Sequence, residues 1–138
     1  MAFWRLHRRL FELSRGRIGA RVAGFDILLL TTIGRRSRRP LRVALSYVED
    51  DDGNPVVLGS RAGDDRHPGW YLNLQAHPLA EILRRGETER VRARTTVGAE
   101  RERLWRRFIA VDPDYAEYQR RTSRVLPVVV LEPAGDAA

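Results

Sequence analysis

The chain has 138 residues, of which 43% are hydrophobic and 31% charged, and it contains no cysteine. This length and apolar content are typical of one globular domain, so wholesale disorder and two independent cores are excluded. The lack of cysteine excludes disulfides, thiolate metal sites and Cys nucleophiles.

The positive charge is concentrated in the first third of the chain. All 25 basic residues are arginine, whose planar guanidinium group grips phosphate and carboxylate through paired hydrogen bonds. Residues 1–42 carry a net charge of +9, whereas the rest of the chain carries −2. An excess confined in this way predicts an anionic partner near the N-terminal third.

The first 24 residues are predicted to form an amphipathic helix over Phe3–Leu13 and a linker. At 100° per residue the aromatic and leucine side chains fall on one half of this helix, and the charged side chains cluster opposite. The N-terminus lacks the apolar core of a secretion signal, and no segment approaches the ~20 apolar residues of a membrane-spanning helix. We therefore expect a cytoplasmic protein.

The next segments predict strands. Two apolar, β-branched runs, Phe25–Ile33 and Leu41–Val48, favour a hairpin joined by the turn at residues 34–40. The turn-forming cluster at residues 50–54 then precedes a third strand over Pro55–Gly59.

The second half of the chain alternates strands with short helices. Pro68 stands at the first position of a predicted helix that continues over Gly69–Ala76. Further strands are predicted over Leu79–Leu83, Thr88–Val97 and Val125–Leu131, and further helices over Ala99–Val111 and Tyr115–Arg121. Six strands joined mostly by tight turns favour an antiparallel barrel over a doubly wound sheet. We predict an α+β, mostly β domain over residues 25–133, with short peripheral helices and a frayed tail at residues 134–138.

The strongest local signal for binding is the turn at residues 34–40. Four of the five residues between Gly34 and Pro40 are arginine, and the fifth is Ser37. Guanidinium groups, a hydroxyl and backbone amides at the end of a strand favour a cradle for phosphate. The alternative is a solvated basic turn. An ATP-binding loop is disfavoured, because the Gly-Lys-Ser/Thr ending is missing.

A second candidate site is the loop Gly59-Ser60-Arg61-Ala62-Gly63. Its small residues would let a flat ring approach the backbone, and the Ser60 hydroxyl could bind a carbonyl or nitro oxygen. A plain flexible loop is the alternative.

Aromatic residues on two short helices, at Trp70, Tyr71, Tyr115 and Tyr118, either line a slot for a planar substrate or belong to the core. The three histidines have no metal-ligand spacing, so we predict no metal site.

Taken together, five segments resemble the deazaflavin-dependent nitroreductase family. They are LLLTTIGRRS at residues 28–37, GSRAG at 59–63, HPGWYLNL at 67–74, YAEYQ at 115–119 and LPVVV at 126–130. Their order and spacing are jointly specific, and the resemblance covers residues 25–133. It implies a split β-barrel of the kind used by flavin-mononucleotide oxidases. It also implies coenzyme F420 as hydride carrier and a quinone or nitroaromatic as acceptor.

The resemblance also implies roles for residues. The phosphate and oligoglutamate tail of F420 would bind the turn at residues 34–40, called the arginine turn below. The ring of F420 would lie along the strand that follows this turn. The residues assigned to the coenzyme are Arg35, Arg36, Ser37, Arg38, Arg39, Arg42, Val43, Ala44, Leu45, Ser46, Gly59, Ser60, Arg61, Gly69, Trp70, Tyr71 and Asn73. The candidate catalytic residues, which would face the acceptor together with Trp70, are Ser60, Tyr115 and Tyr118.

Three positions depart from the family pattern. Arg38 stands where relatives often have glycine, Leu41 where they often have arginine, and Asp112 where some carry a further substrate-facing tyrosine. We therefore do not transfer the family's phosphate ligands, or its activity on nitro compounds, to this chain.

Several alternatives stay open. The same barrel could hold flavin mononucleotide or heme, or the chain could be a basic module that binds nucleic acid through charge without sequence specificity. The N-terminal helix either packs on the barrel or lies on an anionic membrane, on the inner face of the cell membrane, which would suit a lipid-soluble quinone. The protein is a monomer or a homodimer.

Overall fold

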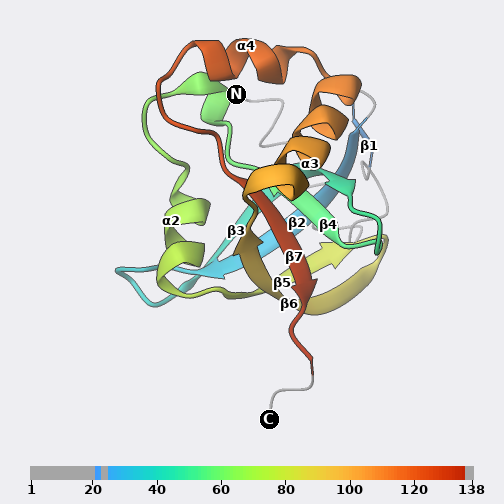
Figure 1. Ribbon diagram of the computed structural model, residues 1–138. Coiled ribbons are helices and arrows are strands. Elements are labelled where there is room, and N and C mark those ends of the chain that lie inside the picture. The colour runs from blue at the N-terminus through green and yellow to red at the C-terminus, as the bar shows by residue number, and fades with distance from the viewer. Residues whose placement is uncertain (1–20, 23–24, 136–138) are drawn as a thin grey trace.

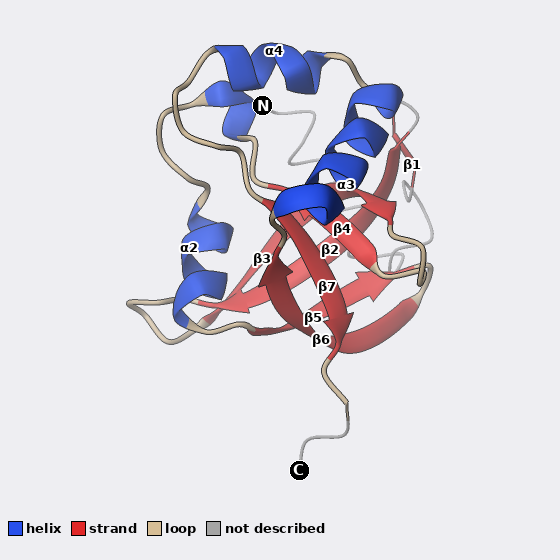
Figure 2. Ribbon diagram, viewed as in Figure 1, coloured by secondary structure: helices blue, strands red, loops and turns tan. Residues whose placement is uncertain are grey.

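The computed structural model describes residues 21–22 and 25–135, and within them strands β2 to β7 close into an antiparallel barrel (Figures 1 and 2). The barrel strands are β2 (Phe25–Ile33), β3 (Pro40–Glu49), β4 (Pro55–Leu58), β5 (Leu79–Arg84), β6 (Glu87–Thr95) and β7 (Val128–Pro133). Their order is β2-β3-β4-β7-β6-β5, and β5 pairs back with β2. The predicted split barrel is confirmed, and its closure leaves these strands no long unpaired edge.

The helices lie outside the sheet or at one end of it. They are η1 (Arg61–Gly63), α2 (Gly69–Ala76), α3 (Gly98–Val111) and α4 (Asp114–Arg120). The predicted bounds of β2 and α2 match the structure. The predicted linker before residue 25 contains a strand of two residues, β1 (Arg21–Val22), which pairs with the start of β2. So short a run leaves no alternation of side chains from which a strand is recognised.

The final strand was predicted too early. Val125–Leu131 was expected, but β7 begins at Val128 and continues to Pro133. The backbone amide and carbonyl of Leu126 form hydrogen bonds with side chains and not with a neighbouring strand. Its amide donates to Gln119 Oε1 at 3.0 Å, and its carbonyl accepts from Arg101 Nη2 at 2.9 Å. At the other end, Pro133 lies opposite Val91 in the ladder with β6.

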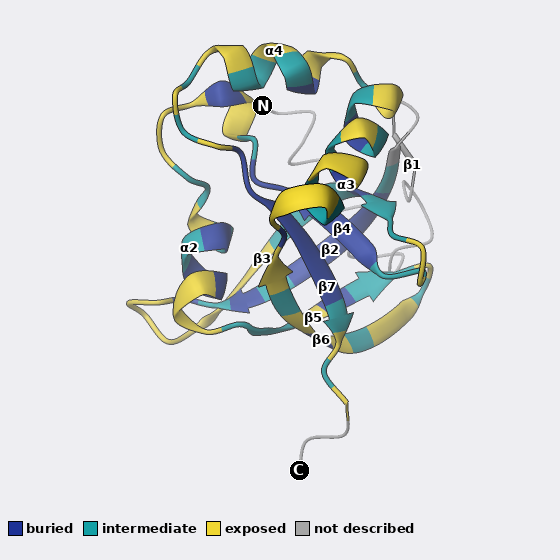
Figure 3. Ribbon diagram, viewed as in Figure 1, coloured by how far each residue is buried: buried dark blue, intermediate teal, exposed yellow. Residues whose placement is uncertain are grey.

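Strands β4 and β7 are buried on both faces, which explains why their sequences are continuous apolar runs (Figure 3). Val57 and Val129 point into the barrel interior, where they pack with Leu28 and Leu30 of β2. The alternate residues of both strands point outward and pack against α3 and α4, the second core cluster. That cluster consists of Val56, Leu58, Leu104, Phe108, Tyr115, Leu126, Val128 and Val130.

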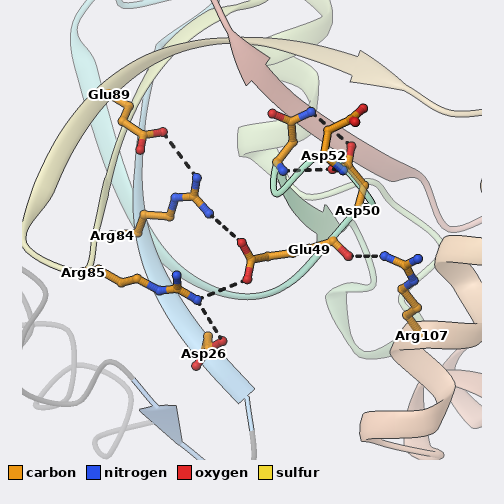
Figure 4. A network of polar contacts seen from close by, with 9 residues as sticks. Asp26, Glu49, Asp50, Asp52, Arg84, Arg85, Glu89 and Arg107 are labelled. Atoms are coloured by element: carbon orange, nitrogen blue, oxygen red, sulfur yellow. Dashed lines mark hydrogen bonds and ion pairs between the residues drawn. The ribbon is translucent and has the colours of Figure 1, made fainter.

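The two ends of the barrel are closed differently. At the end where β2 turns into β3, Tyr71 and Leu74 of α2 join the interior cluster. At the other end, a charged network surrounds Glu49 (Figure 4). The carboxylate of Glu49 pairs with Arg84 at 3.4 Å and with Arg85 at 3.1 Å. Arg107 of α3 donates to the Glu49 carbonyl, so the network also fastens α3 to the barrel.

The predicted N-terminal helix, Phe3–Leu13, lies outside the described residues. Among the residues that the structure describes, no helix is both long and apolar enough to cross a membrane.

Candidate functional site

The arginine turn is a closed loop that projects beside α2 (Figure 1). The Gly34 amide donates to the Arg39 carbonyl at 2.8 Å, and the Arg38 amide donates to the Gly34 carbonyl at 2.9 Å. The Ser37 hydroxyl accepts the Arg39 amide at 3.2 Å. These bonds explain how a turn with four arginines keeps one conformation despite their mutual repulsion.

Asn73 of α2 fastens the turn to the helix. Its Oδ1 accepts from the Arg35 amide at 3.1 Å and from Arg35 Nη1 at 3.0 Å, while its Nδ2 donates to Thr32 Oγ1 at 3.1 Å. Asn73 is only 3% exposed. It was predicted to contact the coenzyme, and the structure shows that its amide is occupied in holding Arg35.

The guanidinium groups of the turn and of Arg42 on β3 are not neutralised by the rest of the described chain. Arg35, Arg36, Arg38, Arg39 and Arg42 are all exposed. Seven arginines elsewhere in the described residues form ion pairs, but none of these five does. Within the described residues, this segment is therefore a concentration of positive charge without a carboxylate partner.

The Ser60 loop leads from β4 through η1 into α2, and it lies against α4. Arg61, Ala62 and Gly63 all have positive φ, at 42°, 51° and 79°. A Cβ on Gly63 would lie 2.5 Å from the Tyr118 carbonyl oxygen, so the backbone there reaches α4 as closely as a glycine allows. The Ser60 side chain is half-buried and makes no hydrogen bond within the described part of the chain.

Sequence reasoning missed the residue that organises this loop, Arg124. Its guanidinium group donates to the carbonyls of Gly59, Ser60 and Asp64, each at 2.9 Å. No local motif surrounds Arg124, since its partners are about 60 positions earlier in the chain, and the contact exists only in the folded molecule.

Tyr115 is bound to the strand that follows the arginine turn. Its hydroxyl lies 3.0 Å from Ser46 Oγ, and either atom can donate. Burial raises the pKa of Tyr115, an effect that the bond to Ser46 partly opposes, so its phenol stays protonated near neutral pH. The ring also packs edge to face on Tyr118, at 5.9 Å between centroids.

The four predicted coenzyme residues of β3 divide between two faces. Val43 and Leu45 pack against the barrel interior, whereas Ala44 packs against the opposite, outer cluster with Ile27 and Leu29. Ser46 reaches Tyr115. Only Ala44 and Ser46 thus present side chains on the outer face, and Val43 and Leu45 could contribute backbone alone.

The two predicted aromatic residues of α2 also differ in their surroundings. Tyr71 is 6% exposed, and its hydroxyl contacts Thr95 Oγ1 at 3.0 Å. Of the two roles expected for it, lining a substrate slot or belonging to the core, this burial favours the core. Trp70 is half-buried at the edge of the same cluster.

Contacts along the chain link three of the predicted site segments to one another. Arg35 Nη1 donates to the carbonyl of Gly69 at 3.5 Å, which joins the turn to the start of α2. The Ser60 loop runs directly into that helix and contacts α4, which carries Tyr115 and Tyr118.

Comparisons with known proteins agree with this geometry. The family model described as F420H(2)-dependent quinone reductase matches residues 3–133. An F420H(2)-dependent quinone reductase of Mycobacterium tuberculosis is 38% identical over 131 residues, which cover 92% of this chain and 87% of the relative.

Two solved structures are similar as well. The structure of an F420-H2 dependent reductase (FDR-A) matches with a TM-score of 0.70 at 36% identity, covering 77% of this chain and 93% of the other. A structure described as a domain-swapped dimer matches with a TM-score of 0.72 at 33% identity, covering 95% and 98%. The resemblance seen in the sequence is confirmed, and the chain belongs to the F420H(2)-dependent quinone reductase family.

Proposed function

We propose that this protein transfers hydride from reduced F420 to a quinone, and that residues 35–42 anchor the anionic part of the coenzyme. The observation that carries this proposal is the set of five arginines that have no carboxylate partner within the described residues. F420 carries a phosphate and an oligoglutamate tail, and guanidinium groups bind both kinds of anion bidentately.

The neighbouring groups fit the ring end of the same ligand. When bound, F420 supplies the hydride, and the protein supplies position and electrostatics. The outer face of β3 offers Ala44 and Ser46, and the Ser60 hydroxyl, which has no hydrogen-bond partner among the described residues, can bind a ligand oxygen. Ser60 and Tyr115 would then donate hydrogen bonds to the acceptor oxygen that gains electron density. A tyrosine phenol is protonated and can donate at neutral pH, and burial favours that form further by raising the pKa of Tyr115.

We infer that a quinone, rather than a nitroaromatic, is the preferred acceptor. Asp112 stands where some relatives carry a substrate-facing tyrosine, and its Oδ1 accepts the Asp114 amide at 2.9 Å at the start of α4. This side chain lies in the link between α3 and α4 and is half-buried, so it does not supply the aromatic surface that a nitroaromatic ring would stack on.

We also propose a homodimer, because a relative at 33% identity is described as a domain-swapped dimer. Sedimentation analysis of the full chain should give twice the monomer mass of 15.9 kDa. Association with an anionic membrane remains a prediction about residues 3–13, and it is tested by cosedimentation with anionic lipid vesicles.

The function is tested by mixing the protein with reduced F420 and menadione without oxygen. We expect saturable oxidation of the deazaflavin at a rate proportional to protein concentration, with coenzyme binding detected by calorimetry. Reduced flavin mononucleotide in place of F420, and titration with heme or a DNA duplex, separate the other interpretations. Neither binding nor oxidation of F420 at saturating concentrations would contradict the proposal.

A further inference from the structure

Arg124 lies between α4 and β7, and its side chain reaches back to one loop. Nε donates to the Asp64 carbonyl, Nη1 to the Gly59 carbonyl and Nη2 to the Ser60 carbonyl, each at 2.9 Å. A second contact of Nη1 is His67 Nδ1 at 3.2 Å. One guanidinium group therefore bridges the beginning, middle and end of the loop at residues 59–67, which only the fork of an arginine can do.

The loop needs such a bridge because its own conformation is unfavourable. Arg61 and Ala62 are not glycine, yet both occupy the left-handed region, which side chains with a Cβ adopt rarely. Within the loop, the Gly63 amide bonds the Ser60 carbonyl and the Asp64 amide bonds the Arg61 carbonyl, each at 2.9 Å. The Ser60 carbonyl is thus shared between the internal turn and Arg124.

Arg124 is itself fixed relative to the helix that carries the two tyrosines. Gln119 of α4 donates from Nε2 to the Arg124 carbonyl at 2.7 Å, and its Oε1 accepts the Leu126 amide at 3.0 Å. The Arg124 amide donates to Thr122 Oγ1 at 3.2 Å. Tyr115 and Tyr118 lie on the same short helix as Gln119, so their position and that of Ser60 are coupled through Arg124.

We propose that Arg124 is a positioning residue for the quinone reductase reaction, which sets Ser60 against Tyr115 and Tyr118 without contacting the acceptor itself. This inference rests on the proposed function, because Ser60 and the tyrosines are assigned there to the acceptor. Arg124 has no role in binding the anions of the coenzyme, which the proposal places at residues 35–42. Its replacement should therefore affect turnover of the acceptor more than affinity for F420.

The kinetic test compares Arg124→Gln with Arg124→Lys and with the control Arg120→Gln. Arg120 is an exposed neighbour on α4 whose side chain pairs, among the described residues, only with Glu117. For Arg124→Gln we expect kcat/KM for menadione to fall on the order of 10- to 100-fold, because small displacements of aligned groups cost that much. Affinity for F420, measured by calorimetry, should change less than about threefold. For Arg124→Lys, kcat/KM should lie between the values of Arg124→Gln and the wild type. The control Arg120→Gln should match the wild type.

Two further measurements separate positioning from general loss of structure. Guanidinium ion added to Arg124→Ala, at concentrations too low to unfold the protein, should restore part of the missing turnover, while the same concentration of sodium chloride should not. In protein without coenzyme, amide exchange at Gly63 and Asp64 should accelerate in Arg124→Gln.

The histidine of the loop gives a spectroscopic signature. Arg124 has only donors, so His67 Nδ1 accepts and the ring proton is on Nε2. Burial, and secondarily the charge of Arg124, lowers the pKa of His67, whose other neighbours include the Tyr71 ring and Arg61. In Arg124→Gln, a titration followed by NMR should show that the pKa of His67 has risen.

The outcomes are distinguishable. If the wild type reduces menadione and Arg124→Gln does so with the same kcat/KM, the positioning role of Arg124 is overturned. Loss of turnover that follows only from unfolding at the assay temperature, with no rescue by guanidinium, would overturn it as well. A different result is an inactive wild type, while amide exchange at Gly63 and Asp64 and the titration of His67 respond to Arg124→Gln as expected. That result would contradict the proposed function. Should Arg124→Gln fail to fold, Arg124→Lys serves for every measurement.

Discussion

At the scale of single residues, the site depends on polar side chains that are buried and fully bonded. Asn73 uses its oxygen for Arg35 and its nitrogen for Thr32, so it both orients a cation and satisfies a hydroxyl that is 1% exposed. A buried polar group that loses its partner is more costly than the bond itself is worth, because it has no water to replace that partner. Asn73 therefore contributes both to stability and to the position of Arg35.

Replacing Asn73 with alanine should lower the free energy of unfolding by about 1–3 kcal/mol, since Thr32 and the Arg35 amide lose their partner. Urea denaturation measures this change. The control is Gln75→Ala on the same helix, where an exposed side chain makes one long bond of 3.3 Å to Tyr71 and the expected change is about 0.5 kcal/mol or less. Equal stability of the two variants would show that Asn73 does not hold the turn.

The exposed arginines lead to a prediction about affinity. Arg36→Ala combined with Arg38→Ala should weaken F420 binding by about tenfold or more for each charge-assisted hydrogen bond that the substitutions remove, at roughly 1.5–3 kcal/mol per bond. Added salt should weaken wild-type binding more than binding by the double variant. Arg90→Ala together with Arg92→Ala, two exposed residues of β6, is the matched control. Unchanged affinity in the double variant would move the anion site elsewhere.

At the scale of elements, the loop between β4 and α2 is shaped by how closely it approaches its neighbours. A Cβ on Gly59 would lie 2.7 Å from Pro127 Cγ, and one on Gly63 would lie 2.5 Å from the Tyr118 carbonyl oxygen. Gly63 additionally has φ of +79°. These glycines allow the loop to pack closely against Pro127, just before β7, and against the backbone of α4.

The substitution Gly63→Ala separates backbone strain from steric conflict when it is compared with Gly98→Ala. Gly98 also has positive φ, at 63°, but a Cβ there would meet nothing within 4 Å. Gly98→Ala should therefore cost about 1–2 kcal/mol of stability from strain alone, and Gly63→Ala should cost more and also reduce turnover. Equal costs in thermal denaturation would mean that the contact with α4 relaxes freely.

At the scale of the whole molecule, polar contacts outside the strand ladders attach α3 to the barrel. The network at Glu49 joins β3 to the β5–β6 turn, and Arg107 adds α3 (Figure 4). A second group centres on Arg94 of β6, which contacts Glu100 of α3 at 2.6 Å and Glu132 of β7 at 2.8 Å. Both groups bind α3, which no strand ladder holds.

Stability should fall in acid, in part through Glu100. The hydrogen bond from Arg94 lowers the pKa of Glu100 in the folded protein. Its contribution is therefore fully present above the ordinary glutamate pKa of about 4.3 and is lost as pH falls through the lowered folded value. Glu100→Gln should be less stable than the wild type at pH 7, by about 1 kcal/mol or less because the pair is partly exposed.

This difference between Glu100→Gln and the wild type should shrink on acidification below about pH 4.3. Thermal denaturation between pH 7 and 3 measures it, with the exposed Glu81→Gln as control. A difference that stays constant over this range would show that Arg94 does not favour the charged carboxylate.

The sequence by itself determined the elements and the family. The bounds of β2 and α2, the antiparallel barrel and the arginine turn follow from local patterns, because strand alternation, helix starts and turn residues act over a few positions. The aromatic residues could not be assigned in this way, since the partners of Tyr71 and Tyr115, Thr95 and Ser46, lie far from them in the sequence.

Only the tertiary structure decided how the site is assembled. Asn73 binds Arg35 across 38 positions, Arg124 binds the Gly59 carbonyl across 65, and Tyr115 contacts Ser46 across 69. Such contacts form when the barrel closes and brings the ends of distant strands together. A hydrogen bond between residues so far apart in the chain leaves no periodic pattern in the sequence, and for this reason Arg124 became visible only in the fold.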